Sequence, residues 1–389
     1  MNANLDDRFA AAGVDEPVRD HNYQGGIIDI NYQRRGYLPQ YDPLNQFPCD
    51  SELSRLDDIG RDLPSLLMDH GFRQYVRELQ IPPWPEKSLN VTDLSALRLY
   101  YVRLGFIASA YVNQVGAETV NLLPRNIAIP LCAVCRLLGR PPILSYDGYA
   151  LYNWKRYDVD KPIALGNIDT IQNFVHLYDE HWFIVIHVEI EAIASRILDG
   201  IARAGDALVS KDEEILNQSL RTIAEALQDQ IRVLRRIPEH MDPALYYKTF
   251  RPYIRFFEHI VYEGVERLPI NYRGETGAQS SIIPTVVAFM KIPHESSTLT
   301  EHLADMRNYM PPEHRCLVER IAAFPDLREM AGRDAFNAVL DNLSEFRQVH
   351  HGWAEEYISK HTDDPRGTGG TPYMHWLTQL IDETRNHRL

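Results

Sequence analysis

The chain has 389 residues, enough for two packed units at roughly 150 residues per domain. Hydrophobic residues make up 44% of it, and the formal net charge of -14 argues against nucleic-acid or anionic-membrane partners, which need clustered Lys and Arg. No run approaches the ~20 apolar residues of a membrane span. The first residues lack the basic and apolar regions of a secretion signal, so we expect a cytoplasmic protein.

The four cysteines, in a chain this long, do not indicate a disulfide framework. Cys132 and Cys135 form a CxxC within the apolar segment IPLCAVCRLLG, with no second Cys/His pair nearby. A metal or redox role is one interpretation of this pair. The sequence favours the other, two buried thiols on a helix, in keeping with a reducing cytoplasm.

Residues 1–50 are rich in Tyr, Asn, Asp and Pro and show little helical periodicity, so we expect an extended arm packed on the body. Helical patterns begin at Ser51 and are strongest over 93–116, where apolar residues recur every three or four places. The prolines of GRPPILSYDGYALYNW mark a connection near residues 150–160. Residues 51–153 are therefore predicted to form a small helical domain.

Residues 154–389 are predicted to form a larger helical bundle. Its expected helices cover 181–205, 211–237, 246–264, 280–292 and 334–361, and alternating strand patterns are almost absent. The fold class is all-α, a small N-terminal helical domain and a larger C-terminal bundle.

Two glycine-rich stretches, YRGETGAQSS (272–281) and HTDDPRGTGGTP (361–372), do not resemble ordinary helix connections. Glycine allows unusual backbone angles and close approach to a ligand, although a mobile surface loop has the same composition. The sequence contains no GxSxG, HExxH or GxxxxGK[ST] motif, which argues against those catalytic classes.

His350 is the strongest single candidate for chemistry, because it falls on the apolar stripe of its helix. That stripe comprises Phe336, Val339, Leu340, Leu343, Phe346, His350, Trp353 and Tyr357. Such a histidine is either a core residue or an axial ligand of haem iron. Arg347, one turn earlier, fits a haem propionate or a surface ion pair. His351 points about 100° away and is the weaker ligand.

Arg251 is the second candidate, because it lies in the aromatic segment YYKTFRPYIRFF. Its guanidinium could bind a substrate carboxylate while the rings stack on a planar group. It could equally pack its stem on the rings with its head in water, and Arg255 competes for the binding role.

Beyond these residues, a series of short sequence motifs follows along the chain. They are LPRNIAIPLC, RPPILSYDGYALYNWK, VEIEAIAS, FRPYI, GAQSS, MRNYMPPEHR, FRQVHHGWAEEYI and GTGGTPYM. From about Asp93 nearly to the C-terminus the sequence resembles the indoleamine 2,3-dioxygenase family. The resemblance implies haem b enclosed between the two domains, with the iron on His350 and the substrate carboxylate on Arg251.

The resemblance also implies a set of pocket residues. Distal or substrate-lining positions fall on Tyr146, Tyr149, Ala150, Tyr246, Thr276 and Gly277, and a substrate-closing position falls on Thr371. Counting back from VEIEAIAS without gaps, His181 stands where the family commonly has a phenylalanine, and Val185 replaces a small polar residue. Tyr149 is bulkier than the cysteine expected in mammalian forms. These departures put the identity of the substrate in question.

The implied reaction adds both atoms of O2 across the indole C2–C3 bond of tryptophan, giving N-formylkynurenine and placing the enzyme in tryptophan catabolism. It requires an external reductant. One alternative is a haem oxygenase or peroxygenase of specialised metabolism that acts on a substituted indole or another aromatic. A second is a haem protein that binds gas without turnover, which we expect to carry an output module not evident here.

Overall fold

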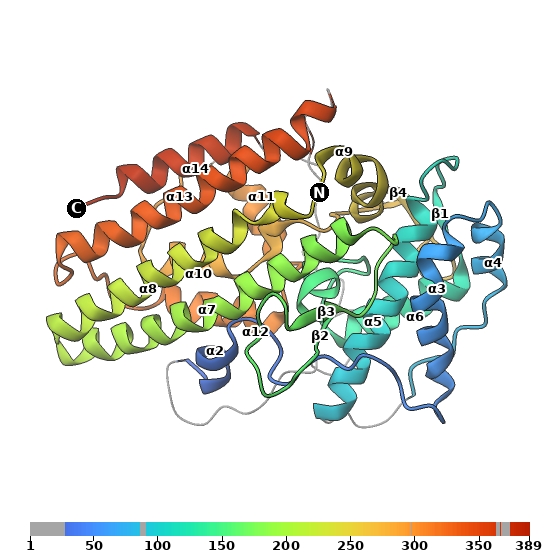
Figure 1. The fold of residues 1–389 in the computed structure, drawn as a ribbon, viewed down its shortest axis with the longest axis horizontal. Coiled ribbons are helices and arrows are strands. Elements are labelled where there is room, and N and C mark those ends of the chain that lie inside the picture. The colour runs from blue at the N-terminus through green and yellow to red at the C-terminus, as the bar shows by residue number, and fades with distance from the viewer. Residues whose placement is uncertain (1–27, 86–90, 297, 363–365, 367–373) are drawn as a thin grey trace.

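The computed structural model describes residues 28–85, 91–296, 298–362, 366 and 374–389, and helices dominate this part of the chain (Figure 1). The all-α prediction is confirmed. The helices of the first part are α2 (Ile30–Arg35), η1 (Glu52–Ser54), α3 (Arg55–Leu66), α4 (Phe72–Glu78), α5 (Val91–Val112) and α6 (Arg125–Leu137).

Helix α5 lies at the centre of this part. Every residue from Leu97 to Val112 is buried, as expected of a helix that is apolar on all sides and packs among neighbours. The buried Arg103 is balanced by the Asp57 carboxylate at 2.9 Å and by the Gln172 side-chain oxygen at 2.7 Å. These contacts tie α5 to α3 and to the segment that precedes α7.

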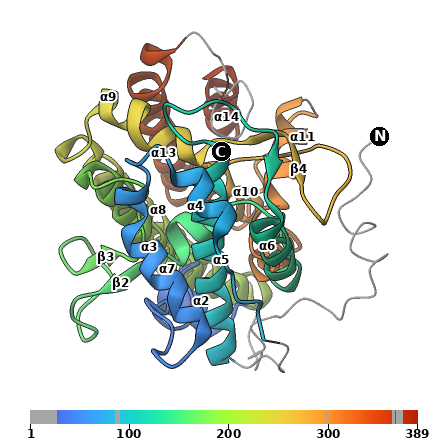
Figure 2. The same cartoon turned by 90° about the vertical axis from the view of Figure 1, so that its right-hand side faces the viewer.

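Long helices form the rest of the body and lie side by side in two views (Figures 1 and 2). They are α7 (Tyr178–Ser210), α8 (Glu213–Leu234), α13 (Arg333–Tyr357) and α14 (Met374–Asn386). Shorter helices are α9 (Pro243–Leu245), α10 (Ile282–Phe289), α11 (Thr298–Arg307), α12 (Pro312–Ala322), η3 (Ile237–Glu239) and η7 (Ser359–His361). Asp212 accepts a hydrogen bond from the Ile215 amide and so caps α8 after the tight α7–α8 turn.

The helix expected over 246–264 is wrong. The chain forms η4 (Tyr246–Phe250), a single π-turn, and η5 (Arg251–Ile254), a 3-10 turn, and then becomes strand β4 (Phe257–Tyr262). Pro252 explains the break, because proline lacks an amide donor and clashes with the preceding turn of a helix.

The few strands that the structure describes form two small sheets. In one, β4 pairs parallel with β1 (Leu122–Leu123) and antiparallel with β5 (Ile270–Tyr272). In the other, β2 (Trp154–Arg156) pairs antiparallel with β3 (Ile168–Thr170). The β1–β4 pair joins the first part of the chain to the second.

Residues 28–50 pack on the body, while residues 1–27 of the expected arm lie outside the described residues. Gly36, at φ +64°, turns the chain directly against α7, and a Cβ there would stand 2.1 Å from the Glu191 carbonyl oxygen. Only glycine fits this contact. The division into 51–153 and 154–389 stays a prediction, since residues of both parts contribute to one continuous core.

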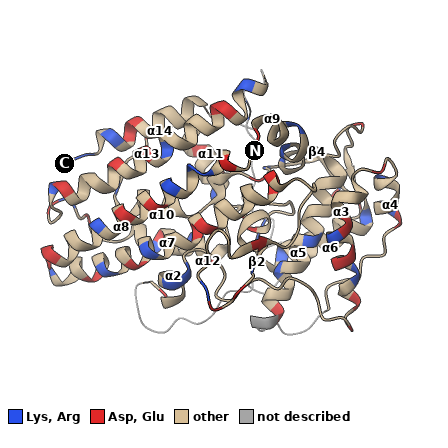
Figure 3. Cartoon of the chain, viewed as in Figure 1, with Lys and Arg blue, Asp and Glu red and all other residues tan. Residues whose placement is uncertain are grey.

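Acidic and basic residues are interspersed along the long helices (Figure 3). Across the described residues, no helix is long and apolar enough to cross a membrane. The CxxC lies on α6 as expected, with Cys135 buried and Cys132 half-buried, and burial raises the pKa of the Cys132 thiol to about 12. A thiol this hard to ionise is a poor nucleophile and a poor metal ligand, which favours the structural interpretation.

Candidate haem and substrate site

His350 lies on α13, and its side chain is exposed. Desolvation by the surrounding protein atoms nevertheless lowers the pKa of its imidazole to about 4. His187 on α7 also lowers this pKa, so the two imidazoles lie near each other. His350 is therefore neutral at physiological pH, the form that binds iron.

The neighbours of His350 on α13 face α14 instead. His351 Nε2 lies 3.5 Å from the Thr378 hydroxyl. The buried Arg347 guanidinium donates to the Leu380 carbonyl oxygen at 2.7 Å and to the Thr384 hydroxyl. These contacts of Arg347 hold α14 against α13, and its expected contact with a haem propionate stays a prediction.

One face of α7 forms the wall that carries the aromatic cluster. Phe183, His187 and Glu191 follow one another at four-residue spacing and so share this face. The Phe183 ring lies 4.4 Å from His187 and 5.7 Å from Tyr246, measured between ring centres. The His187 ring stands edge-on to Tyr146 at 5.9 Å. Tyr246 and Tyr146, both expected to line the pocket, are thereby brought to the same side of α7.

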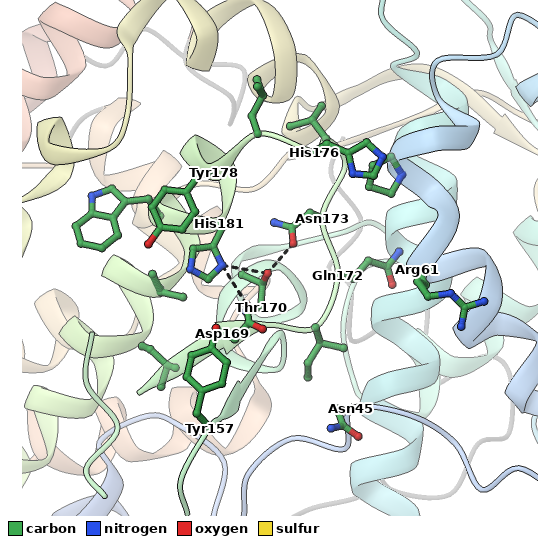
Figure 4. Close-up of a pocket in the computed structure, with 18 of the residues that line it drawn as sticks. Asn45, Arg61, Tyr157, Asp169, Thr170, Gln172, Asn173, His176, Tyr178 and His181 are labelled. Atoms are coloured by element: carbon green, nitrogen blue, oxygen red, sulfur yellow. Dashed lines mark hydrogen bonds and ion pairs between the residues drawn. The ribbon is translucent and has the colours of Figure 1, made fainter. Parts of the chain in front are cut away.

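His181 and Val185 lie on the other face of α7, about 200° from Phe183 and His187 at 100° per residue. They line a separate pocket of about 650 Å³, where His181 Nδ1 lies 3.2 Å from the Asp169 carboxylate (Figure 4). His181 and Val185 are therefore not brought beside the aromatic cluster. Phe183 and His187, each two residues later, occupy that face of α7.

The Tyr146 and Tyr149 hydroxyls are held by buried carboxyl groups. Tyr146 donates to Glu191 at 2.9 Å, and Tyr149 donates to Glu180 at 3.1 Å. Burial raises the pKa of each glutamate to about 7. Tyr149 and the buried Ala150 lie on η2 (Asp147–Leu151), a single π-turn. Both tyrosine hydroxyls are therefore engaged by protein, and both side chains are buried.

The glycine-rich segment 272–281 packs against the turn that follows Arg251. The Glu275 amide donates to the Ile254 carbonyl oxygen at 3.0 Å, and η6 (Gly277–Gln279) follows, capped by the Thr276 hydroxyl. Gln279 accepts from the Tyr146 amide at 2.9 Å. A Cβ on Gly277 would meet no atom within 4 Å, so the backbone at Gly277 borders open space.

Two glycines of this segment predict effects of alanine substitution that differ in size. In Gly274→Ala the new Cβ would stand 2.4 Å from Ile254 O and from Arg255 C, both backbone atoms that cannot turn aside. We expect a loss of about 1–3 kcal/mol in the free energy of unfolding. Gly277→Ala should change it by less than about 0.5 kcal/mol. Urea denaturation of both variants checks this, and equal losses would contradict the packing argument.

Glu275 predicts a pH dependence of stability. Burial raises the pKa of its carboxyl from 4.5 to about 8 in the folded protein. The stability that the neutral carboxyl contributes is therefore fully present below the pKa of the unfolded state, and it is lost as the pH rises through 8. Glu275→Gln should flatten the fall in unfolding free energy between pH 5 and 8, by at most about 1.4 kcal/mol per pH unit. Denaturation curves of wild type and variant that run parallel over this range would contradict the assignment.

Arg251 is buried without an acidic partner. It is 5% exposed, its guanidinium lies 5.0 Å from the centre of the Tyr247 ring, and its Nε has no hydrogen-bond partner. Among the described residues no carboxylate forms an ion pair with it. Because an unpaired buried charge is costly, this geometry suits a site that receives an anionic ligand. The preceding residue, Phe250, packs against Phe183 with 6.1 Å between their ring centres, and this contact links Arg251 to the aromatic cluster.

These residues fit a haem group and an aromatic acid. His350 is neutral, a second histidine lies near it, Gly277 has open space beside it, and the buried Arg251 guanidinium has no acidic partner among the described residues. Thr371, expected to close over the substrate, and most of the 361–372 stretch lie outside the described residues.

Comparison with known proteins identifies the family. The sequence profile described as indoleamine 2,3-dioxygenase matches residues 29–387. This chain belongs to the indoleamine 2,3-dioxygenase family. Indoleamine 2,3-dioxygenase 1 of Rattus norvegicus is 29% identical over 84% of this chain and 87% of its own. Indoleamine 2,3-dioxygenase of Saccharomyces cerevisiae is 27% identical over 90% of each chain. A protein of Haliotis madaka named myoglobin is 25% identical over 84% of this chain and 89% of its own.

Membership of the indoleamine 2,3-dioxygenase family makes this chain a haem-dependent dioxygenase, an oxidoreductase that uses haem b, O2 and an indole. Sequence reasoning had missed Phe183, His187, Glu191 and Glu275. The four-residue spacing along α7 was a usable signal for the first three. Burial of Glu275 has no signal in the sequence.

Proposed function

We propose that the enzyme cleaves the indole C2–C3 bond of tryptophan and releases N-formylkynurenine. The observation that carries this proposal is Arg251, a buried guanidinium without a carboxylate partner beside an aromatic cluster. Tryptophan combines the two features that this arrangement suits, a carboxylate and a planar ring.

His350 would hold the haem iron, which supplies the activation of dioxygen when haem is bound. Arg251 would orient the substrate by its carboxylate, while Phe183, Tyr146 and Tyr246 position the ring and exclude water. We further propose an external reductant that keeps the haem ferrous. The four cysteines are free thiols, in keeping with the cytoplasm as the compartment.

Product mass spectrometry tests the proposal. Haem-loaded enzyme incubated with a reductant, O2 and tryptophan should yield a product heavier than the substrate by two oxygen atoms, and both atoms should come from labelled dioxygen. A product with one added oxygen would overturn the dioxygenation of tryptophan. Oxygen uptake is measured in the same reaction, because one relative is named a myoglobin. If no indole causes oxygen uptake, a haem protein that binds gas without turnover becomes the favoured function.

A related oxygenase that acts on a substituted indole is the second candidate. Of the three sequence departures that put the substrate in question, His181 and Val185 line a separate pocket on the other face of α7. The third, the bulky Tyr149, lies beside Phe183 with 6.2 Å between ring centres. Parallel reactions with hydroxylated indoles therefore belong in the same experiment, and a strong preference for them would favour this candidate.

A further inference from the structure

Glu275 carries a buried carboxyl group that has no partner within the described part of the chain. The residue is 3% exposed, and its side chain forms no ion pair and no hydrogen bond there. Its two oxygens are nevertheless not among the polar atoms sealed beneath protein. Because a buried polar group without a partner is costly, this carboxyl suits a site that receives a donor from a ligand.

The Glu275 carboxyl lies near the aromatic cluster. Burial raises the pKa of the Tyr146 and Tyr149 hydroxyls, and Glu275 is one of the carboxyl groups that raise both further. Those hydroxyls already donate to Glu191 and Glu180, so neither satisfies Glu275. An acceptor at the edge of the cluster is therefore left for a ligand.

Arg251 and Glu275 are anchored to the same turn. Arg251 begins η5, and the Glu275 amide donates at 3.0 Å to the carbonyl oxygen of Ile254, the last residue of that turn. The two side chains form no ion pair with each other, and Arg251 Nε also lacks a hydrogen-bond partner. Two buried groups that can carry opposite charges, share one turn and do not meet suit a ligand that carries both charges, as an amino acid does.

We propose that Glu275 binds the ammonium group of an amino-acid substrate while Arg251 binds its carboxylate. This inference rests on the proposed function, since it requires an amino acid in the pocket. Glu275 is then a specificity residue, which distinguishes an indole amino acid from an indole acid without the amine.

Binding of the ammonium group is coupled to the proton of Glu275. Burial raises the pKa of this carboxyl to about 8, so near pH 7 it is mostly neutral before the substrate binds. A neighbouring ammonium group stabilises the ionised form. The carboxyl therefore gives its proton to the solvent, and the ammonium keeps its own three. Burial also raises the pKa of Glu180 and Glu191 to about 7, so the share of Glu275 is the proton release that Glu275→Gln removes.

Equilibrium titration of the Soret band of the haem-loaded enzyme compares L-tryptophan with indole-3-propionate, which lacks the amine. Wild type should bind L-tryptophan about tenfold or more tightly, as expected for a hydrogen bond to a charged group. In Glu275→Leu this preference should shrink to about twofold or less. Glu275→Gln keeps a neutral acceptor and should retain part of it, which guards against misfolding of the leucine variant. Glu266→Gln, an exposed position between β4 and β5, is the matched control and should keep the wild-type ratio.

Titration calorimetry in two buffers of different ionisation enthalpy counts the protons released at pH 7. L-tryptophan should release up to about one proton from wild type, and at least about half a proton less from Glu275→Gln. Indole-3-propionate should show no such difference between the two proteins.

An unchanged preference for L-tryptophan in Glu275→Leu, or equal proton release from wild type and Glu275→Gln, would overturn the inference. Loss of the Soret band from both Glu275 variants but not from Glu266→Gln would make Glu275 a contact of the haem and would overturn it as well. If L-tryptophan perturbs the spectrum of no protein, wild type included, the proposed function itself fails, and this pattern is distinct from the other three.

Discussion

Replacing His350 with alanine is expected to abolish the specific haem spectrum of this protein. The imidazole is neutral, belongs to a 25-residue helix and lies near His187. Loss of a direct iron ligand should weaken haem binding by about 100-fold or more, since even removal of a ligand's supporting contact costs 10–100-fold. Absorption spectra of wild type and variant, after reconstitution with haem, measure the effect.

The neighbouring histidine provides the control for this experiment. His351→Ala changes the adjacent residue on α13, whose imidazole lies beside Thr378 of α14, and should leave the Soret band unchanged. Added imidazole should restore a band to His350→Ala by filling the vacated position. A wild-type band in His350→Ala, or loss of the band in His351→Ala, would show that the ligand has been assigned to the wrong residue.

Arg251→Leu is expected to weaken the binding of L-tryptophan by about 30-fold to several thousand-fold. This range corresponds to about 2–5 kcal/mol for removing one partner of a buried charge pair. Tryptamine, which lacks the carboxylate, should bind the variant no worse than it binds wild type. Soret titrations with both ligands separate a lost carboxylate contact from general damage to the site.

Two further variants sharpen the test of Arg251. Arg251→Lys should recover only part of the affinity, because an ammonium group cannot reproduce the two parallel hydrogen bonds of a guanidinium. Arg255→Leu removes the competing arginine, which lies 5.2 Å from the centre of the Phe256 ring, and should leave binding unchanged. Equal losses for tryptophan and tryptamine in Arg251→Leu would instead make Arg251 a packing residue.

The position of Arg251 illustrates how far sequence reasoning reached. The aromatic neighbours and the family motif singled out this arginine, yet the expected helix around it does not exist. The chain breaks at Pro252 and turns into β4, and this break brings Ile254 against the Glu275 amide. Local periodicity could not reveal the break, because the apolar spacing continues through the proline.

Helix α7 shows a second limit of prediction from the sequence, the choice of which helix face meets the site. Ile184, Val185, Ile186 and Val188 are all buried, so both sides of this helix are apolar and no single stripe marks the side that faces the haem. A gap-free count pointed to His181 and Val185, two residues before Phe183 and His187 of the aromatic cluster. The ring contacts of Phe183 and His187 decide the face, and they depend on residues such as Tyr146 and Tyr246 that are remote in sequence.

The sequence alone determined the helical class, the candidate roles of His350 and Arg251, and the family, because these depend on local periodicity and on motifs within one segment. The tertiary structure decided which face of α7 meets the cluster, that Arg347 holds α14, and that Glu275 is buried and neutral. The physical reason is that solvation and hydrogen-bond partners are set by segments distant along the chain. A carboxyl group or an imidazole acquires its charge state and its direction only when those segments pack around it.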